Sequence, residues 1–172
     1  MTRIELADPA RTTGASRAIL DEVARHAGGV PNGVRVLAAS PLVLEAWWQF
    51  ERALARSSVR LAVREQLAVL SAATSGCAYC LELHTATALA VGVDPIDVAT
   101  ASEGRAVDPR TDATLRFARE VLATRGPVPD AVIDDARAAG LGDAELVEVL
   151  AVVALNTLHN LCNRAAATPT QR

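Results

Sequence analysis

The chain has 172 residues, of which 51% are hydrophobic and 22% charged; this length and composition exclude wholesale disorder and favour a single domain over residues 1–172. All 17 basic residues are arginines, spread along a chain of net charge -3, so we expect no nucleic-acid partner. The sequence has neither a secretory signal pattern nor an apolar run of about 18 residues, so we expect a cytoplasmic protein without a membrane span.

Helical periodicity begins near the N-terminus and is followed by a turn. Residues 16–28 carry apolar side chains at intervals of three and four and run into a glycine pair, which predicts a helix. Residues 29–34 contain Pro31 and the Asn32-Gly33 pair, which are typical turn residues. We therefore expect a turn at residues 29–34.

The next predicted helix has an aromatic face. Ser40 is a suitable N-cap and Pro41 suits the first helical position. Trp47 and Trp48 then fall on the apolar stripe of this helix. Because helix-spaced aromatic residues mostly pack in a core or at a subunit interface, we expect packing rather than a cofactor platform here.

The rest of the chain also reads as helices. Asp94 with Pro95 is a strong start signal for one of them. No segment alternates apolar and polar residues as a strand would, so the predicted fold class is all-α, built from packed helical hairpins. The other predicted helices cover residues 58–74, 77–91, 111–125, 129–139 and 143–167.

The scarce reactive groups gather between positions 65 and 84. Cys77, Cys80 and His84 have the spacing i, i+3 and i+7, which places them on one helical face. A thiol in the first turn of a helix is favoured as thiolate, and His84 lies one turn beyond Cys80, where it can accept a proton. Glu65 precedes them on an apolar helix and can face His84 if the two helices form a hairpin.

Several kinds of site compete for these four residues. Haem attachment would need a histidine at position 81, which is Leu81. Structural zinc on Cys77, Cys80, His84 and Glu65 would lack the second paired-ligand cluster that such sites usually have. A purely structural role, with two buried cysteines and a hydrogen-bonded histidine, would explain each residue singly. It would not explain why all four agree in spacing. A redox site needs only the cysteine pair and a proton acceptor.

The pattern E-x11-C-x2-C-x3-H at residues 65–84 resembles the AhpD-like alkylhydroperoxidases of the carboxymuconolactone decarboxylase superfamily. The resemblance continues through "ALAVGVD" after the motif and, more loosely, through the C-terminal "LNTLHNLCNR". It covers roughly residues 30–168, with residues 1–30 as a less typical N-terminal extension.

The resemblance implies an all-α protein that assembles as a homotrimer or hexamer, with no metal and no organic cofactor. It further implies that Cys80 attacks the hydroperoxide and that Cys77 resolves the resulting sulfenic acid as a disulfide. His84, acting with Glu65 through a bridging water, would draw the proton from Cys80. A dithiol reductant protein of the lipoamide-adaptor or thioredoxin type would restore the pair.

Two features of the motif disagree with the best-known members. Tyr79 stands between the cysteines where those proteins often carry histidine, which removes a second proton-relay group. In addition, the helix dipole taken alone would favour Cys77 as the more acidic thiol. The decarboxylase branch of the superfamily generally lacks the cysteine pair, so its chemistry is not expected here.

The sequence thus predicts a thiol-dependent peroxidase or disulfide oxidoreductase acting on hydroperoxides. One alternative is a non-enzymatic oligomeric module that senses oxidants or binds zinc through the same residues. Another is a small-molecule lyase or hydrolase that uses Glu65 and His84 as an acid/base pair.

The polar residues of the last predicted helix are expected to be mainly structural. His159 and Cys162 fall in an apolar run and are interpreted as a satisfied core histidine and a buried thiol. Asn156, Asn160 and Asn163 could cap or bridge helices, and could also border the site.

Overall fold

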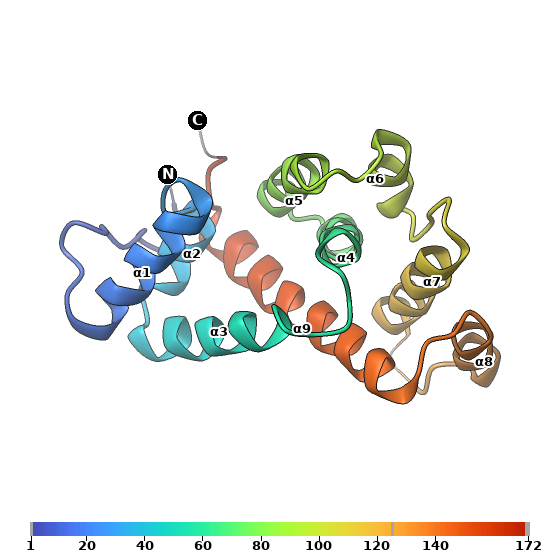
Figure 1. The fold of residues 1–172 in the computed structure, drawn as a ribbon. Coiled ribbons are helices and arrows are strands. Elements are labelled where there is room, and N and C mark those ends of the chain that lie inside the picture. The colour runs from blue at the N-terminus through green and yellow to red at the C-terminus, as the bar shows by residue number, and fades with distance from the viewer. Residues whose placement is uncertain (1, 125, 171–172) are drawn as a thin grey trace.

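The computed structural model describes residues 2–124 and 126–170, and within these residues the chain forms nine α-helices and no strand (Figure 1). The predicted all-α fold class is therefore confirmed. The helices are α1 (Gly14–Ala27), α2 (Asn32–Leu37), α3 (Pro41–Leu54), α4 (Leu61–Ser75), α5 (Ala78–Ala90), α6 (Pro95–Ala101), α7 (Pro109–Ala123), α8 (Asp130–Ala138) and α9 (Asp143–Ala166).

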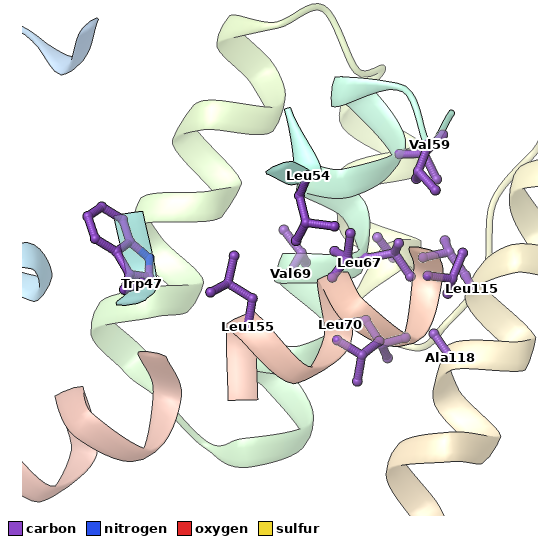
Figure 2. Packing of buried hydrophobic residues seen from close by; sticks show 14 of the residues in the cluster. Trp47, Leu54, Val59, Leu67, Val69, Leu70, Leu115, Ala118 and Leu155 are labelled. Atoms are coloured by element: carbon purple, nitrogen blue, oxygen red, sulfur yellow. The ribbon is translucent and has the colours of Figure 1, made fainter. Parts of the chain in front are cut away.

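Helices α4 and α9 form the centre of the molecule. Helix α4 packs against α5, α6, α7 and α9, and α9 also packs against α2, α3, α5 and α7. In Figure 1, α1 to α3 lie on one side of this pair and α6 to α8 on the other. Leu67 and Leu70 of α4 belong to one hydrophobic cluster with Leu115 of α7 and Leu155 of α9 (Figure 2). This cluster fixes the two central helices against each other.

Helix α9 is long and apolar enough to cross a membrane by length and composition alone, with a mean hydropathy of 1.3 over its most apolar window. A single helix of this kind is weak evidence for a membrane span, since the core helix of a soluble protein passes the same test. Helix α9 packs against five other helices, and 33% of the same window is buried.

The predicted start signals act as caps. The Ser40 hydroxyl accepts a hydrogen bond from the Val43 amide at the start of α3, and Asp94 accepts one from Ile96 at the start of α6. Helix α7 starts at Pro109, two residues before its predicted start, because Asp108 provides a further cap. The predicted end of this helix, Arg125, lies outside the described residues.

The turn predicted at residues 29–34 is wrong in its second half, because Asn32 begins the short helix α2. Gly33 is buried within that helix, and its close neighbours explain why the position is glycine. A Cβ atom added there would lie 2.9 Å from Cε1 of Tyr79 and 3.0 Å from Nδ2 of Asn163. Gly33 is therefore a glycine because other helices pack closely against it. In the sequence, such a glycine cannot be told from one that forms a turn.

Candidate functional site

The junction between α4 and α5 brings the reactive residues together. Helix α4 ends at Gly76, whose left-handed backbone (φ 68°) reverses the chain. The Cys77 amide donates a hydrogen bond back to the Ala72 carbonyl at 3.0 Å, which closes the turn. Cys77 is then the N-cap of α5, so the two helices pack as the hairpin that the sequence predicted.

The two cysteines are joined as a disulfide and lie beneath the surface. Their Cα atoms are 5.3 Å apart, and each residue is only 2% exposed. As N-cap, Cys77 also accepts a hydrogen bond at Sγ from the Cys80 amide at 3.4 Å. The pair is thus held by the first turn of α5, where backbone N–H groups favour a thiolate after reduction.

His84 and Glu65 form a direct pair across the hairpin. Nδ1 of His84 lies 2.9 Å from Oε2 of Glu65, and the two side chains are 18% and 14% exposed. The contact differs from the resemblance, which implied a water between Glu65 and the proton transfer. A carboxylate bound at Nδ1 fixes the orientation of the imidazole and leaves Nε2 to exchange a proton.

A cavity of about 470 Å³ opens over one member of the cysteine pair. Cys80 and His84 line it, whereas Cys77 and Glu65 do not. We call the side formed by Cys80, Leu83 and His84 the α5 wall. Access from the cavity therefore distinguishes the two cysteines, a distinction that their shared helix start could not make.

A second group of lining residues comes from other helices, and we call it the opposite wall: Trp47, Trp48 and Glu51 of α3 and His159 of α9. Trp47 is 5% exposed and packs in the hydrophobic core as predicted, but it also faces the cavity. Its ring centroid lies 5.3 Å from that of His159, with the planes inclined by 30°. The aromatic face of α3 thus serves the core and the cavity at once.

The interpretation of His159 as a satisfied core histidine is wrong. Its Nε2 is buried and has no hydrogen-bond partner among the described residues, and the ring belongs to the opposite wall. Burial, with a smaller contribution from His84, lowers the pKa of His159 to about 4. The imidazole is therefore neutral near pH 7.

Sequence reasoning missed Glu51. It lies one helical turn after Trp47 on the same stripe of α3, and that position on an apolar face is the signal that could have revealed it. Desolvation raises the pKa of the Glu51 carboxyl, and the nearby Glu65 adds to the rise. The positive charges of Arg64 and His84 act in the opposite direction.

Asn163 of α9 contacts the redox pair directly. Its Nδ2 donates to Sγ of Cys80 at 3.5 Å, and the Thr168 hydroxyl donates to its Oδ1 at 2.8 Å. The expectation that an asparagine of the last helix could border the site therefore has a geometric basis at this position. Asn156 also lines the cavity but donates to the Val152 carbonyl of its own helix, and Asn160 is buried without a partner for Nδ2 among the described residues.

Tyr79 joins α5 to α2 through its hydroxyl, which accepts a hydrogen bond from the Gly33 amide at 2.8 Å. Burial raises the pKa of the Tyr79 phenol. Cys162 is free and partly buried, and burial likewise raises the pKa of its thiol. Tyr79 packs with the redox pair, whereas Cys162 packs against the main hydrophobic cluster.

In residues 2–124 and 126–170, no group of three or more His, Cys, Asp or Glu side chains is arranged to hold a metal ion. The zinc-binding alternative therefore gains no support from the geometry. In the same region, Glu65 of α4 pairs with His84 of α5 across the hairpin, and Cys77 and Cys80 lie together at the start of α5.

The sequence matches a known family over the segment that contains this hairpin. Residues 41–124 match the Carboxymuconolactone decarboxylase family. The matched segment runs from the start of α3 to the end of α7 and includes all four predicted site residues. No curated protein matches the chain.

Solved structures share the fold over nearly the whole chain. An uncharacterized peroxidase-related protein from Ralstonia eutropha JMP134, described as an alkylhydroperoxidase AhpD core, is 24% identical with a TM-score of 0.88, over 99% of this chain and 92% of that one. A peroxidase-related protein from Silicibacter sp. TM1040 is 20% identical (TM-score 0.82, 99% and 95% covered). The debrominase Bmp8, as a cysteine-to-alanine variant in complex with 2,3,4-tribromopyrrole, is 17% identical (TM-score 0.83, 99% and 92% covered).

Proposed function

We propose that this chain, which is an AhpD-like member of the carboxymuconolactone decarboxylase superfamily, is a thiol-dependent peroxidase or related disulfide oxidoreductase that reduces hydroperoxides through Cys77 and Cys80. The observation that carries the proposal is the asymmetry of the cysteine pair. Cys80 lines the apolar cavity together with His84, and Cys77 stands behind it at disulfide distance.

The reaction begins with the reduced pair. His84, oriented by Glu65 and one helical turn from Cys80, accepts the Cys80 proton. The N–H of Asn163 stabilises the resulting thiolate. The thiolate attacks the terminal oxygen of the hydroperoxide, which forms an S–O bond, breaks the O–O bond and releases an alcohol once the leaving oxygen is protonated.

The second step closes the disulfide. Cys77, as thiolate, attacks the sulfur of the Cys80 sulfenic acid, and the hydroxyl leaves as water after taking up one proton. The Cys80 amide stabilises the Cys77 thiolate before this attack. The helix dipole, which favoured Cys77 as the nucleophile, therefore serves the resolving step, whereas access to the cavity assigns the first attack to Cys80.

The cavity supports an organic hydroperoxide as substrate. Its wall is mainly apolar, with the two tryptophans and Leu155 among its lining, so a substrate with a hydrocarbon body gains burial that hydrogen peroxide cannot. A dithiol reductant protein of the lipoamide-adaptor or thioredoxin type regenerates the pair, and no cofactor is needed. We further propose a cytoplasmic protein of one domain, since a reducing compartment is needed to recycle the dithiol.

The exposed face of α9 supports the proposed homotrimer or hexamer. Val147, Leu150, Leu158 and Leu161 are all exposed, and their spacing places them along one side of the helix. An apolar stripe of this length is typical of a subunit interface. A light-scattering mass of one chain at micromolar concentration would contradict the assembly.

A second candidate reaction is reductive dehalogenation of a halogenated aromatic compound. The flat aromatic surfaces of Trp47 and His159 in the cavity favour it, together with the shared fold of the debrominase. Here the Cys80 thiolate would attack the halogen, the ring carbon would take a proton, and Cys77 would displace halide to form the same disulfide. Halide release from a bromopyrrole by the reduced protein tests this reaction.

The decisive experiment measures thiol stoichiometry. The reduced protein receives one equivalent of an organic hydroperoxide, and thiol loss is followed in time with peptide mass mapping. We expect fast loss of two thiols, a Cys77–Cys80 disulfide and recovery with a dithiol. Thiol oxidation no faster than that of a small-molecule thiol would refute the peroxidase proposal.

Further measurements distinguish the proposed peroxidase from the alternative functions, which are a redox sensor, a lyase or hydrolase and a zinc-binding module. A redox sensor would form the disulfide but would not turn over rapidly with a dithiol donor. A lyase or hydrolase based on Glu65 and His84 would retain activity after both cysteines are replaced. Metal analysis of the purified reduced protein tests the zinc-binding module.

A further inference from the structure

We propose that Glu51 is the acid that protonates the oxygen leaving the hydroperoxide, so that the site contains an acid on the opposite wall as well as a base on the α5 wall. This inference rests on the proposed peroxidase function. It assigns a catalytic role to a residue outside the Cys77–His84 motif.

The position of Glu51 provides the geometry. It lines the same cavity as Cys80 and His84, but it comes from α3 whereas they come from α5, and both helices pack against α9. A hydroperoxide attacked by Cys80 has its leaving oxygen on the side away from the sulfur, because the S–O bond forms in line with the O–O bond that breaks. That oxygen therefore points away from Cys80, and in our proposal it lies beside Glu51, which lines the same cavity.

The Glu51 carboxyl is free to act on a ligand. Among the described residues, no hydrogen bond or ion pair engages it. The other carboxylates near the redox pair differ in this respect, since Glu65 is occupied by His84. Burial destabilises the anion of an unpaired carboxyl in a mainly apolar wall. The pKa of Glu51 is raised for this reason.

His84 links the acid to the base. Once His84 takes the Cys80 proton, its positive charge lowers the pKa of Glu51, so the acid becomes stronger when the leaving oxygen needs a proton. His84 itself is a poorer donor at that moment, because the imidazolium is held by the Glu65 carboxylate.

The protons balance over one turnover. The proton of Cys80 moves to His84, and the thiolate attack yields a sulfenic acid while Glu51 gives its proton to the leaving alkoxide. His84 then returns its proton to the Glu51 carboxylate. The Cys77 thiol supplies the last proton to the departing hydroxyl, so that two thiols and one hydroperoxide become a disulfide, an alcohol and water.

Several charged or titratable groups act on Glu51 or line the same cavity. They come from the flanking helix α1, from α3 itself and from α4, α5 and α9, and they are Glu22, His26, Arg52, Arg64, Glu65, His84 and His159.

The test compares two oxidants that share a phenyl group and differ in the leaving group. Cumene hydroperoxide releases an alkoxide, which needs an acid, whereas peroxybenzoic acid releases benzoate, which does not. In single-turnover oxidation of the reduced protein, we expect Glu51→Gln to lower the rate with cumene hydroperoxide on the order of 100-fold. The same variant should keep most of its rate with peroxybenzoic acid.

A pH profile provides a second reading that a structural role would not change. With cumene hydroperoxide, the wild-type rate should fall as pH rises through the raised pKa of Glu51, and Glu51→Gln should lack this fall. Glu45→Gln is the matched control, since it removes one carboxyl from an exposed position of the same helix and should behave as wild type. Added formic acid should partly restore the rate of Glu51→Ala.

The outcomes separate the two proposals. Equal losses with both oxidants, or wild-type rates with cumene hydroperoxide in Glu51→Gln, would overturn the role of Glu51 and leave the peroxidase function standing. Failure of the wild-type protein to lose thiols with either oxidant would overturn both.

Discussion

The two walls of the cavity differ in how their residues are placed in the sequence. The α5 wall takes Cys80 and His84 from positions about one turn apart on a single helix, and its supporting Glu65 from the helix just before. The opposite wall takes Glu51 and His159 from helices in opposite halves of the chain, which meet only when α3 packs against α9.

The difference shows how a site can divide its chemistry. A thiol and its base need fixed mutual geometry, which a helical repeat supplies locally. Burial and unpaired polar groups, by contrast, come from long-range packing. The α5 wall is thus a sequence motif, and the opposite wall is a product of the tertiary structure.

The largest effect should come from the two cysteines of the motif. We expect Cys80→Ser to abolish rapid hydroperoxide-dependent oxidation, because no other thiol lines the cavity among the described residues. Cys77→Ser should still react once and accumulate a sulfenic acid that a dimedone probe traps, with mass spectrometry locating the adduct. If Cys80→Ser keeps full turnover while Cys77→Ser loses its first oxidation, the assignment is reversed.

The next effect concerns the base of the α5 wall. His84→Ala should slow single-turnover oxidation on the order of 100-fold, as expected for removal of a general base. Glu65→Gln should lower the oxidation rate by a smaller factor, since it keeps the imidazole contact but removes the charge that stabilises the imidazolium. Stopped-flow oxidation rates of the two variants and the wild type, measured under the same conditions, check both expectations. Equal rates for wild type and His84→Ala would show that Cys80 needs no base.

The pH dependence of protein stability tests the burial of His159 in the opposite wall. Its pKa is about 4 in the folded protein against 6.5 for the ordinary histidine, so between these values the unfolded chain binds a proton that the folded chain does not. The free energy of unfolding should therefore fall as pH drops from 6.5 towards 4. The full loss is about 3 kcal/mol at one pKa unit per 1.36 kcal/mol. Denaturant titrations should show that His159→Gln removes this part of the slope, and an unchanged slope would contradict the burial of the imidazole.

Gly33 of α2 lies against Tyr79 and Asn163, and its replacement tests this packing. Gly33→Ala places a methyl group against Tyr79 of α5 and Asn163 of α9, and we expect a loss of about 1–3 kcal/mol in the free energy of unfolding, as for overpacking. Gly126→Ala is the control, because a Cβ atom there meets nothing within 4 Å. Equal stability of the two variants would show that Tyr79 and Asn163 accommodate the added methyl group without loss of stability.

Sequence patterns predicted the parts that depend on neighbours along the chain. The helix starts at Ser40 and Asp94 and the hairpin around Gly76 follow from local chemistry, and the structure agrees with them. Helix α2 was missed because an Asn-Gly pair favours a turn, and only the approach of Tyr79 explains why Gly33 is helical. His159 and Glu51 were missed for a related reason. An apolar run indicates burial, but it does not indicate whether a buried polar group has a partner.

The amide of Asn163 has an electrochemical consequence. Its N–H points at Cys80 Sγ because Thr168 holds the other end of the amide, so the donor is in place in the oxidised protein. A fixed donor stabilises a thiolate more than a neutral disulfide sulfur, which raises the reduction potential of the couple. The final turn of α9 therefore makes the disulfide easier to reduce, and it favours regeneration by a dithiol over storage of the oxidised form.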